Sequence, residues 1–160
     1  MSEREHRYQV EVTWSAKSGA GTTDYRSYHR DHHIRAPGKV ADIPASSVPM
    51  FRGDASRYNP EELLVAALSS CHMLWMLHLS AEAGIVVVEY TDQASGVMTE
   101  EPGKGGRFTA VTLRPRMWIT ERARVEDARG LHPRAHQLCF IANSVNFPVQ
   151  VDPVVDVRES

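Results

Sequence analysis

The sequence predicts an α+β fold in which strands surround two helices. Three observations predict it: 160 residues of which 42% are hydrophobic, alternating polar and apolar segments near both ends, and one long apolar segment at 60–83. The length suits one domain, residues 1–160, with a core of its own. The apolar content and a formal net charge of −2 exclude a disordered chain.

The first third of the chain predicts two strands and an irregular loop. Residues 7–14 alternate polar and apolar side chains, which is typical of a strand. Residues 25–35 are polar and aromatic, and we expect a second strand there. Two prolines and a glycine interrupt residues 40–58, so this segment is predicted to be a loop.

The strongest helix signal covers residues 60–83. Asn59 suits the N-cap, Pro60 suits the first turn, and Glu62 stands at the capping-box position. Gly84 suits the position after the last turn. The segment is apolar almost all round, which predicts burial on several sides, at the centre of a domain or at a subunit interface.

The rest of the chain alternates strand and helix signals. The predicted order is strands at 85–90, 94–99 and 108–120, a helix at 125–138, a helical turn at 139–145 and a final strand at 148–157. Pro115 predicts a bulge or an edge in its strand. Pro133 predicts an interruption of its helix.

Charge and hydropathy exclude several partners. The near-neutral charge gives no basic surface for a nucleic acid. The apolar segment 60–83 contains serine, cysteine and histidine, so it is a poor membrane span and no membrane partner is expected. Residues 1–6 lack a basic region followed by an apolar one, which predicts a cytoplasmic protein.

The two cysteines, Cys71 and Cys139, are the first candidates for chemistry. Two thiols are too few for a disulfide framework, and a reducing cytosol disfavours a structural disulfide. Each is therefore either an inert core thiol or a reactive one. His72 and His78, on the same helix as Cys71, are expected to be surface or interface histidines.

A metal site is the weaker alternative. His132, His136 and Cys139 would share one face of an unbroken helix, as zinc ligands do, and this set defines a structural zinc protein as one hypothesis. Pro133 lies inside the set, and no fourth ligand is near. Residues 29–33 (HRDHH) could also attract a metal, although a solvated polar strand is the default. No metal and no other cofactor is therefore expected.

Two segments resemble a known family. Residues 59–71 (NPEELLVAALSSC) resemble the hallmark segment of the OsmC/Ohr superfamily, the osmotically induced and organic hydroperoxide resistance proteins. Residues 135–144 (AHQLCFIANS) match the place of that family's second cysteine. The resemblance implies an OsmC-like fold, with antiparallel sheets around a long buried central helix, in an intertwined homodimer.

The resemblance also implies an activity, the thiol-dependent reduction of organic hydroperoxides to alcohols. Carried over to this chain, Cys71 is the attacking thiolate, Cys139 the resolving thiol and Glu61 the acidic residue. The family's arginine corresponds to Arg30, with Arg52 as the second candidate. The reductant would be an external dithiol, for which the resemblance suggests the lipoyl type.

The chain departs from the family pattern at two places. Residues 28–32 (YHRDH) replace the usual Gly-Gly-Arg context, and Phe140 follows the second cysteine where a proline is common. These departures indicate a divergent OsmC-like subgroup.

The residue types make chemical sense of this assignment. Only a thiolate attacks a peroxide, and burial raises the pKa of a thiol, so a cation is needed beside it. Arginine stays charged when buried, and a carboxylate can hold it. Glu61 and Cys71 lie about 15 Å apart along one helix and about 80° apart around it. A two-fold axis would bring the glutamate of one chain to the cysteine of the other, so we expect a homodimer.

Alternatives remain open at this point. Arg30 could instead pair with Asp24 or Asp31 in solvent, where an ion pair contributes little. The protein could also be a non-catalytic member of the same fold that binds a small apolar ligand or senses oxidation. Both functional hypotheses need an apolar pocket, for which Met73, Trp75 and Met76 are candidates.

Overall fold

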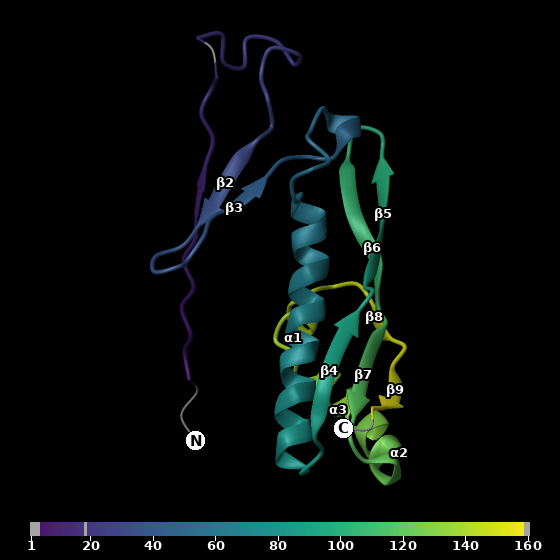
Figure 1. Ribbon diagram of the computed structural model, residues 1–160. Coiled ribbons are helices and arrows are strands. Elements are labelled where there is room, and N and C mark those ends of the chain that lie inside the picture. Colours follow the sequence, from purple (N-terminus) through teal and green to yellow (C-terminus); the bar gives the residue numbers. More distant parts are fainter. Residues whose placement is uncertain (1–3, 18, 159–160) are drawn as a thin grey trace. The chain divides into compact units, whose positions relative to one another are not determined.

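A computed structural model of the protein describes residues 4–17 and 19–158 (Figure 1). Residues 1–3, which belong to the start that predicts a cytoplasmic location, lie outside the described residues. The chain forms two compact units, residues 1–63 and 64–160. That residues 1–160 form a single domain stays a prediction.

The first unit contains a three-stranded antiparallel sheet. Its strands are β1 (Glu11–Thr13), β2 (His32–Arg35) and β3 (Ile43–Ala45), in the order β1-β2-β3. The strands predicted at 7–14 and 25–35 are present but short, and residues 19–27 between them form a series of turns. Trp14 fixes this turn by donating its indole N–H to the carbonyl oxygen of His29 at 2.8 Å. A short 3-10 helix, η1 (Pro49–Phe51), lies in the predicted loop.

Helix α1 (Pro60–Glu82) is the longest element and has the predicted ends. Asn59 and Glu62 form a reciprocal capping box: the Glu62 N–H donates to Asn59 Oδ1 at 2.8 Å, and the Asn59 N–H donates to Glu62 Oε2 at 3.2 Å. Gly84 follows the helix with φ 69°, a left-handed conformation that glycine adopts without strain. By length and composition alone α1 could cross a membrane, a criterion that core helices of soluble proteins also meet.

The second unit contains two three-stranded sheets. Their strands are β4 (Val87–Asp92), β5 (Ser95–Glu101), β6 (Gly105–Leu113), β7 (Pro115–Ile119), β8 (Val149–Val151) and β9 (Val154–Val157). The sheet orders are β4-β7-β9 and β5-β6-β8. The segments 87–101, 105–119 and 149–157 therefore each contribute one strand to each sheet. Each sheet has one antiparallel and one parallel pair. The α+β class is thereby confirmed, with mixed sheets.

Prolines divide the predicted strands and the predicted helix. The strand expected at 108–120 is split before Pro115, and the final strand is split at Pro153. The helix expected at 125–138 becomes α2 (Val125–Gly130), which η2 (Arg122–Arg124) precedes, and α3 (His132–Leu138). Pro133 lies in the first turn of α3, where its missing N–H leaves no hydrogen bond unmade. The helical turn expected after Cys139 is η3 (Ala142–Ser144).

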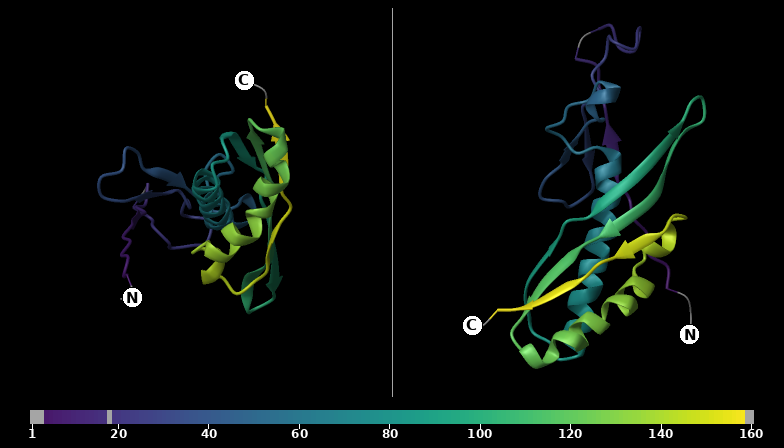
Figure 2. Two further views of the ribbon diagram at one scale, coloured as in Figure 1. Left: turned by 90° about the horizontal axis from the view of Figure 1, so that it is seen from below. Right: turned by 90° about the vertical axis from the view of Figure 1, so that its right-hand side faces the viewer.

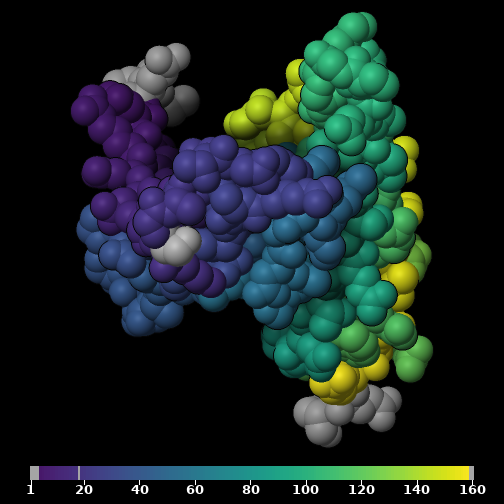
Figure 3. Space-filling model, turned by 90° about the horizontal axis from the view of Figure 1, so that it is seen from above, coloured from purple at the N-terminus to yellow at the C-terminus, as the bar shows by residue number. Residues whose placement is uncertain are grey.

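The core of the second unit lies between α1 and the sheets. In Figure 2, α1 runs along the sheets, and α2 and α3 lie beside its C-terminal half. Met76 packs in a cluster with Met117, Ile119, Ala128, Ala135 and Val155. Leu68 packs with Val111 and Leu113. In contrast, β5 is exposed throughout, and the tip of the β5–β6 hairpin projects into solvent (Figure 3).

Only one face of α1 is buried within the chain. Its buried residues are Leu68, His72, Met76 and Ser80, four residues apart and therefore on one stripe. Leu74 on another face is 62% exposed. The sequence predicted burial on several sides, and a single copy of the chain provides it on one.

Candidate active site

The structure brings the two cysteines together. Cys71 lies near the middle of α1 and is half-buried, whereas Cys139 ends α3 and is 1% exposed. Both are free thiols, and they are neighbours in the structure, since the Cys71 side chain contributes to the raised pKa of Cys139. The Ala142 N–H donates to Cys139 Sγ at 3.4 Å. Two residues 68 positions apart in the sequence thus share one site.

The environment of Cys139 keeps it protonated. Burial, together with the hydrogen bond to Cys71, raises the pKa of the Cys139 thiol to about 11. A thiol with this pKa is a poor nucleophile at neutral pH. Cys71, which is more accessible, is therefore the cysteine that a substrate would meet.

Cys71 lines an apolar cavity of about 460 Å³. One wall is a stripe of α1, and the other is the segment directly after Cys139. The lining residues are Ala67, Ser70, Cys71, Leu74, Trp75, His78, Phe140 and Ile141. Of the three side chains predicted to line a pocket, Trp75 does so. Met73 is not part of this lining, and Met76 lies on the buried face of α1, so those two expectations were wrong.

Two aromatic contacts shape the cavity wall, and the sequence did not predict them. The Trp75 ring meets the Phe140 ring edge to face, with centroids 5.8 Å apart and an interplanar angle of 89°. Trp75 also meets the His78 ring edge to face at 5.6 Å. The one feature of the sequence that could have indicated a role for Phe140 is its position, immediately after a candidate reactive cysteine.

His72, directly after Cys71, points about 100° away from it around the helix and is not part of the cavity lining. It is fully buried, and its ring stacks on His132 of α3 with centroids 5.2 Å apart. His72 Nε2 and His132 Nδ1 are 2.9 Å apart, a hydrogen bond in which one ring donates and the other accepts. Burial lowers the pKa of each histidine to about 4, so both are neutral at pH 7. The expectation of a surface or interface residue was wrong for His72; His78 is exposed.

The zinc hypothesis loses its ligand set in this arrangement. His132 is bonded to His72, and Cys139 is in contact with Cys71, so neither is directed to a shared metal with His136. Across residues 4–17 and 19–158, no three His, Cys, Asp or Glu side chains form a potential metal site.

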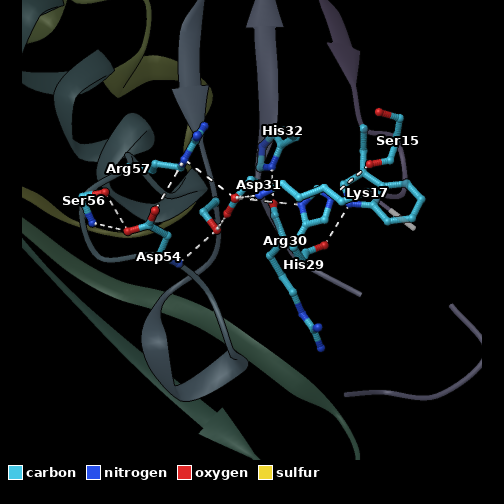
Figure 4. Close-up of polar contacts among 11 residues, drawn as sticks. Ser15, Lys17, His29, Arg30, Asp31, His32, Asp54, Ser56 and Arg57 are labelled. Atoms are coloured by element: carbon cyan, nitrogen blue, oxygen red, sulfur yellow. Dashed lines mark hydrogen bonds and ion pairs between the residues drawn. The ribbon is translucent and has the colours of Figure 1, made fainter. Parts of the chain in front are cut away.

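Arg30 is held by its own loop (Figure 4). Its guanidinium donates to the carbonyl oxygens of Tyr25, at 2.9 Å, and Tyr28. It also lies over both tyrosine rings, 4.6 Å and 3.8 Å from their centroids. In Figure 4 the side chain points away from Asp31. Among the described residues no ion pair joins Arg30 to Asp24 or Asp31, so the alternative of such a pair in solvent was wrong.

Asp31 is the centre of a separate polar cluster that includes an arginine the sequence did not single out. Lys17 and Ser46 donate to Asp31 at 3.0 and 3.1 Å, and these contacts lower the pKa of the carboxyl group. Arg57 Nε lies 4.0 Å from Asp31 Oδ2 and 3.6 Å from Asp54 Oδ2. The feature of the sequence that could have indicated Arg57 is its position, two residues before the N-cap of α1.

The roles of Arg52 and Glu61 stay predictions. Arg52 is exposed and has φ 65°, the one positive φ among the non-glycine residues that the structure describes. Glu61 is half-buried in the first turn of α1. Among the described residues of one chain, Arg30 donates to Tyr25 and Tyr28, and no ion pair or hydrogen bond joins it to Glu61.

Fold and site together define an α+β protein with two free thiols in contact beside an apolar cavity. A family model described as OsmC-like protein matches residues 53–154. The chain therefore belongs to the OsmC-like family. No curated protein matches the chain.

Solved structures agree with this membership. An OsmC-like protein of unknown function from Vibrio cholerae is 34% identical, with a TM-score of 0.84, over 94% of this chain and 100% of that one. An organic hydroperoxide resistance protein from Elizabethkingia anophelis is 21% identical, with a TM-score of 0.65, over 97% and 100%. An organic hydroperoxide resistance protein OsmC from Legionella pneumophila is 20% identical, with the same TM-score, over 95% and 99%. The last two show the shared fold.

Proposed function

We propose that the protein is a cysteine-based peroxidase that reduces organic hydroperoxides to alcohols. The observation that carries the proposal is a free, half-buried Cys71 on an apolar cavity, with the free Cys139 thiol as its neighbour. An apolar cavity favours the organic part of a hydroperoxide over hydrogen peroxide. The organic hydroperoxide resistance proteins of the same fold support this activity.

The proposed reaction has three balanced steps. The Cys71 thiolate attacks the terminal peroxide oxygen, the O–O bond breaks, and the alkoxide takes up a proton to leave as the alcohol. Cys71 is then a sulfenic acid. The Cys139 thiol displaces its hydroxyl group as water and forms the Cys71–Cys139 disulfide. An external dithiol, of the lipoyl type in our proposal, reduces that disulfide by exchange.

Arg30 and Glu61 complete the proposed site. The guanidinium of Arg30 would lower the pKa of the Cys71 thiol, and Glu61 of a second copy would hold it. Arg52 is the competing candidate. We expect Arg30→Met to raise the thiol pKa of Cys71 and to reduce the peroxidase rate, with Arg52→Met as the matched variant. If Arg30→Met leaves both quantities intact while Arg52→Met raises the pKa, the role belongs to Arg52.

The proposed assembly is a cytoplasmic homodimer of single-domain chains. Leu77, outside the cavity lining, exposes 37% of its surface on the unburied side of α1, and a second α1 would cover such an apolar side chain. Sedimentation at low micromolar concentration tests this assembly. A well-folded monomer under those conditions would refute the dimer.

The decisive test of the function is peroxide consumption. We expect turnover of cumene and tert-butyl hydroperoxide, and much slower turnover of hydrogen peroxide, with dihydrolipoamide as reductant rather than glutathione. Cys71→Ser protein is the control and should be inactive. Binding of apolar molecules without consumption of any peroxide would favour the second candidate function, a ligand-binding or oxidation-sensing protein, which the same cavity supports.

A further inference from the structure

We propose that Phe140, together with Trp75, makes the cavity selective for hydroperoxides that carry an aromatic ring next to the peroxide group. This inference rests on the proposed peroxidase function and names the substrate class of the same site. The observation behind it is an aromatic pair at the cavity wall, whose exposed member, Phe140, directly follows Cys139.

The exposure of Phe140 has no explanation in the packing of the chain. Cys139 is 1% exposed, whereas Phe140, the next residue, is 59% exposed and meets Trp75 by the edge of its ring. A phenylalanine in water leaves apolar surface uncovered, which is unfavourable. A ligand in the cavity would cover that surface, because Phe140 is one of its lining residues.

The chemistry of the lining defines the ligand. None of the eight lining residues is a lysine, arginine, aspartate or glutamate. The polar side-chain groups are the Ser70 hydroxyl, the Cys71 thiol, the His78 imidazole and the indole N–H of Trp75. The body of the ligand is therefore uncharged and apolar, and its peroxide group lies at the thiol.

The geometry of the aromatic pair favours a ring over a compact alkyl group. Trp75 and Phe140 are perpendicular, at 89°, so a third ring can lie flat on one of them and meet the other edge to face. Trp75 is four residues beyond Cys71, about 6 Å along the helix axis. A ring against Trp75 thus leaves a benzylic peroxide near the thiol. A tert-butyl group has no flat face to lie on either ring, so it gains nothing from the perpendicular arrangement.

The test is the selectivity of turnover between two substrates. The measured quantity is kcat/KM for cumene hydroperoxide divided by kcat/KM for tert-butyl hydroperoxide. We expect Phe140→Ala to lower this ratio by about tenfold, within the range that apolar pockets achieve. Phe140→Leu keeps apolar bulk without the ring and should lower it as well. Val88→Ala, which shortens a 48% exposed side chain outside the cavity lining, is the control and should leave the ratio unchanged.

Two results would overturn the inference while leaving the peroxidase function in place. One is an unchanged ratio in Phe140→Ala protein. The other is a normal ratio in Phe140→Leu protein, which would show that bulk rather than aromaticity is selected. Circular dichroism of each variant excludes misfolding as the cause of a change.

A binding measurement separates this inference from the proposed function. Cys71→Ser protein should bind 2-phenyl-2-propanol, the product alcohol, at least about tenfold more tightly than tert-butanol by calorimetry, and Phe140→Ala in that background should remove the difference. Absence of turnover with every hydroperoxide would end the peroxidase proposal, yet this binding preference would still be measurable. Equal binding of the two alcohols would refute the aromatic selectivity.

Discussion

Helix α1 meets the segment 132–140 at two neighbouring places, and the two contacts have opposite properties. At one, His72 stacks on His132, and both rings are almost completely removed from solvent. At the other, Cys71 meets Cys139 beside a cavity of about 460 Å³. Consecutive residues of a helix point about 100° apart, so Cys71 and His72 face different surroundings.

The difference separates a structural contact from a reactive one. The histidine pair joins α1 to the start of α3, and Cys139 ends the same short helix. A fixed α3 keeps Cys139 beside Cys71. The thiol pair, in contrast, is open on one side, and Cys71 lines the cavity through which a substrate would arrive. We therefore expect changes at the histidines to alter folding and changes at the thiols to alter chemistry.

The largest expected effect is on the reactive side. Cys71→Ser should abolish peroxide turnover, because the other thiol, Cys139, is buried and, with its pKa raised to about 11, stays protonated at neutral pH. Cys139→Ser should allow one oxidation of Cys71 and block the disulfide. Trapping of the sulfenic acid with dimedone, followed by mass spectrometry, distinguishes the two variants. Unchanged peroxide consumption by Cys71→Ser protein would end the peroxidase proposal.

The next effect is on the structural side. His132→Ala leaves His72 buried without its hydrogen-bond partner and opens a cavity, so we expect a loss of about 2–4 kcal/mol in the free energy of unfolding. Urea denaturation measures it. His78→Ala is the matched control, since His78 is exposed on the same helix, and it should change stability by less than about 0.5 kcal/mol. Equal effects of the two variants would contradict the division into structural and reactive contacts.

The rate of alkylation should distinguish the two thiols. With the pKa of Cys139 raised to about 11, about one Cys139 in a thousand is ionised at pH 8. Iodoacetamide should therefore label the accessible Cys71 first, and labelling of Cys139 should rise steeply only toward pH 11. Peptide mapping after timed quenching follows each site. Faster labelling of Cys139 at pH 8 would show that its environment does not suppress the thiolate.

The remaining expected effect is a pH dependence of stability, which develops only below about pH 6.5. Histidine has a pKa of about 6.5 when unfolded, against about 4 for His72 and His132 in the folded protein, so the unfolded chain binds more protons between these values. The stabilisation is complete above pH 6.5 and declines as the pH falls toward 4, by up to about 1.4 kcal/mol per pH unit for each ring. The charge of nearby His136 acts in the same direction as burial, and that of Asp92 opposes it.

Urea midpoints at pH 7, 6 and 5 measure this slope. The double variant His72→Leu, His132→Leu removes both titrating groups and should show a flatter profile over the same range. An equal slope in the double variant would assign the pH dependence to other residues.

Local signals in the sequence determined the elements of this protein. The capping residues Asn59 and Glu62 and the terminating Gly84 set the ends of α1, because each acts on backbone groups within one helical turn. The prolines at 115, 133 and 153 divided strands and a helix, because each also acts on backbone groups close to it in the sequence. The α+β class and the candidacy of Cys71 and Cys139 followed from these patterns together with the family resemblance.

The tertiary structure decided which faces met. Only packing selected the stripe of α1 that is buried, since the segment is apolar almost all round and no single side stands out in the sequence. The stacking of His72 on His132 joins residues 60 positions apart, and the edge-to-face contact of Trp75 with Phe140 joins residues 65 positions apart. Such pairs depend on how whole elements come together, which no pattern within a few residues records. For that reason the sequence supplied the two thiols, and the fold placed one of them on an open cavity and the other under cover.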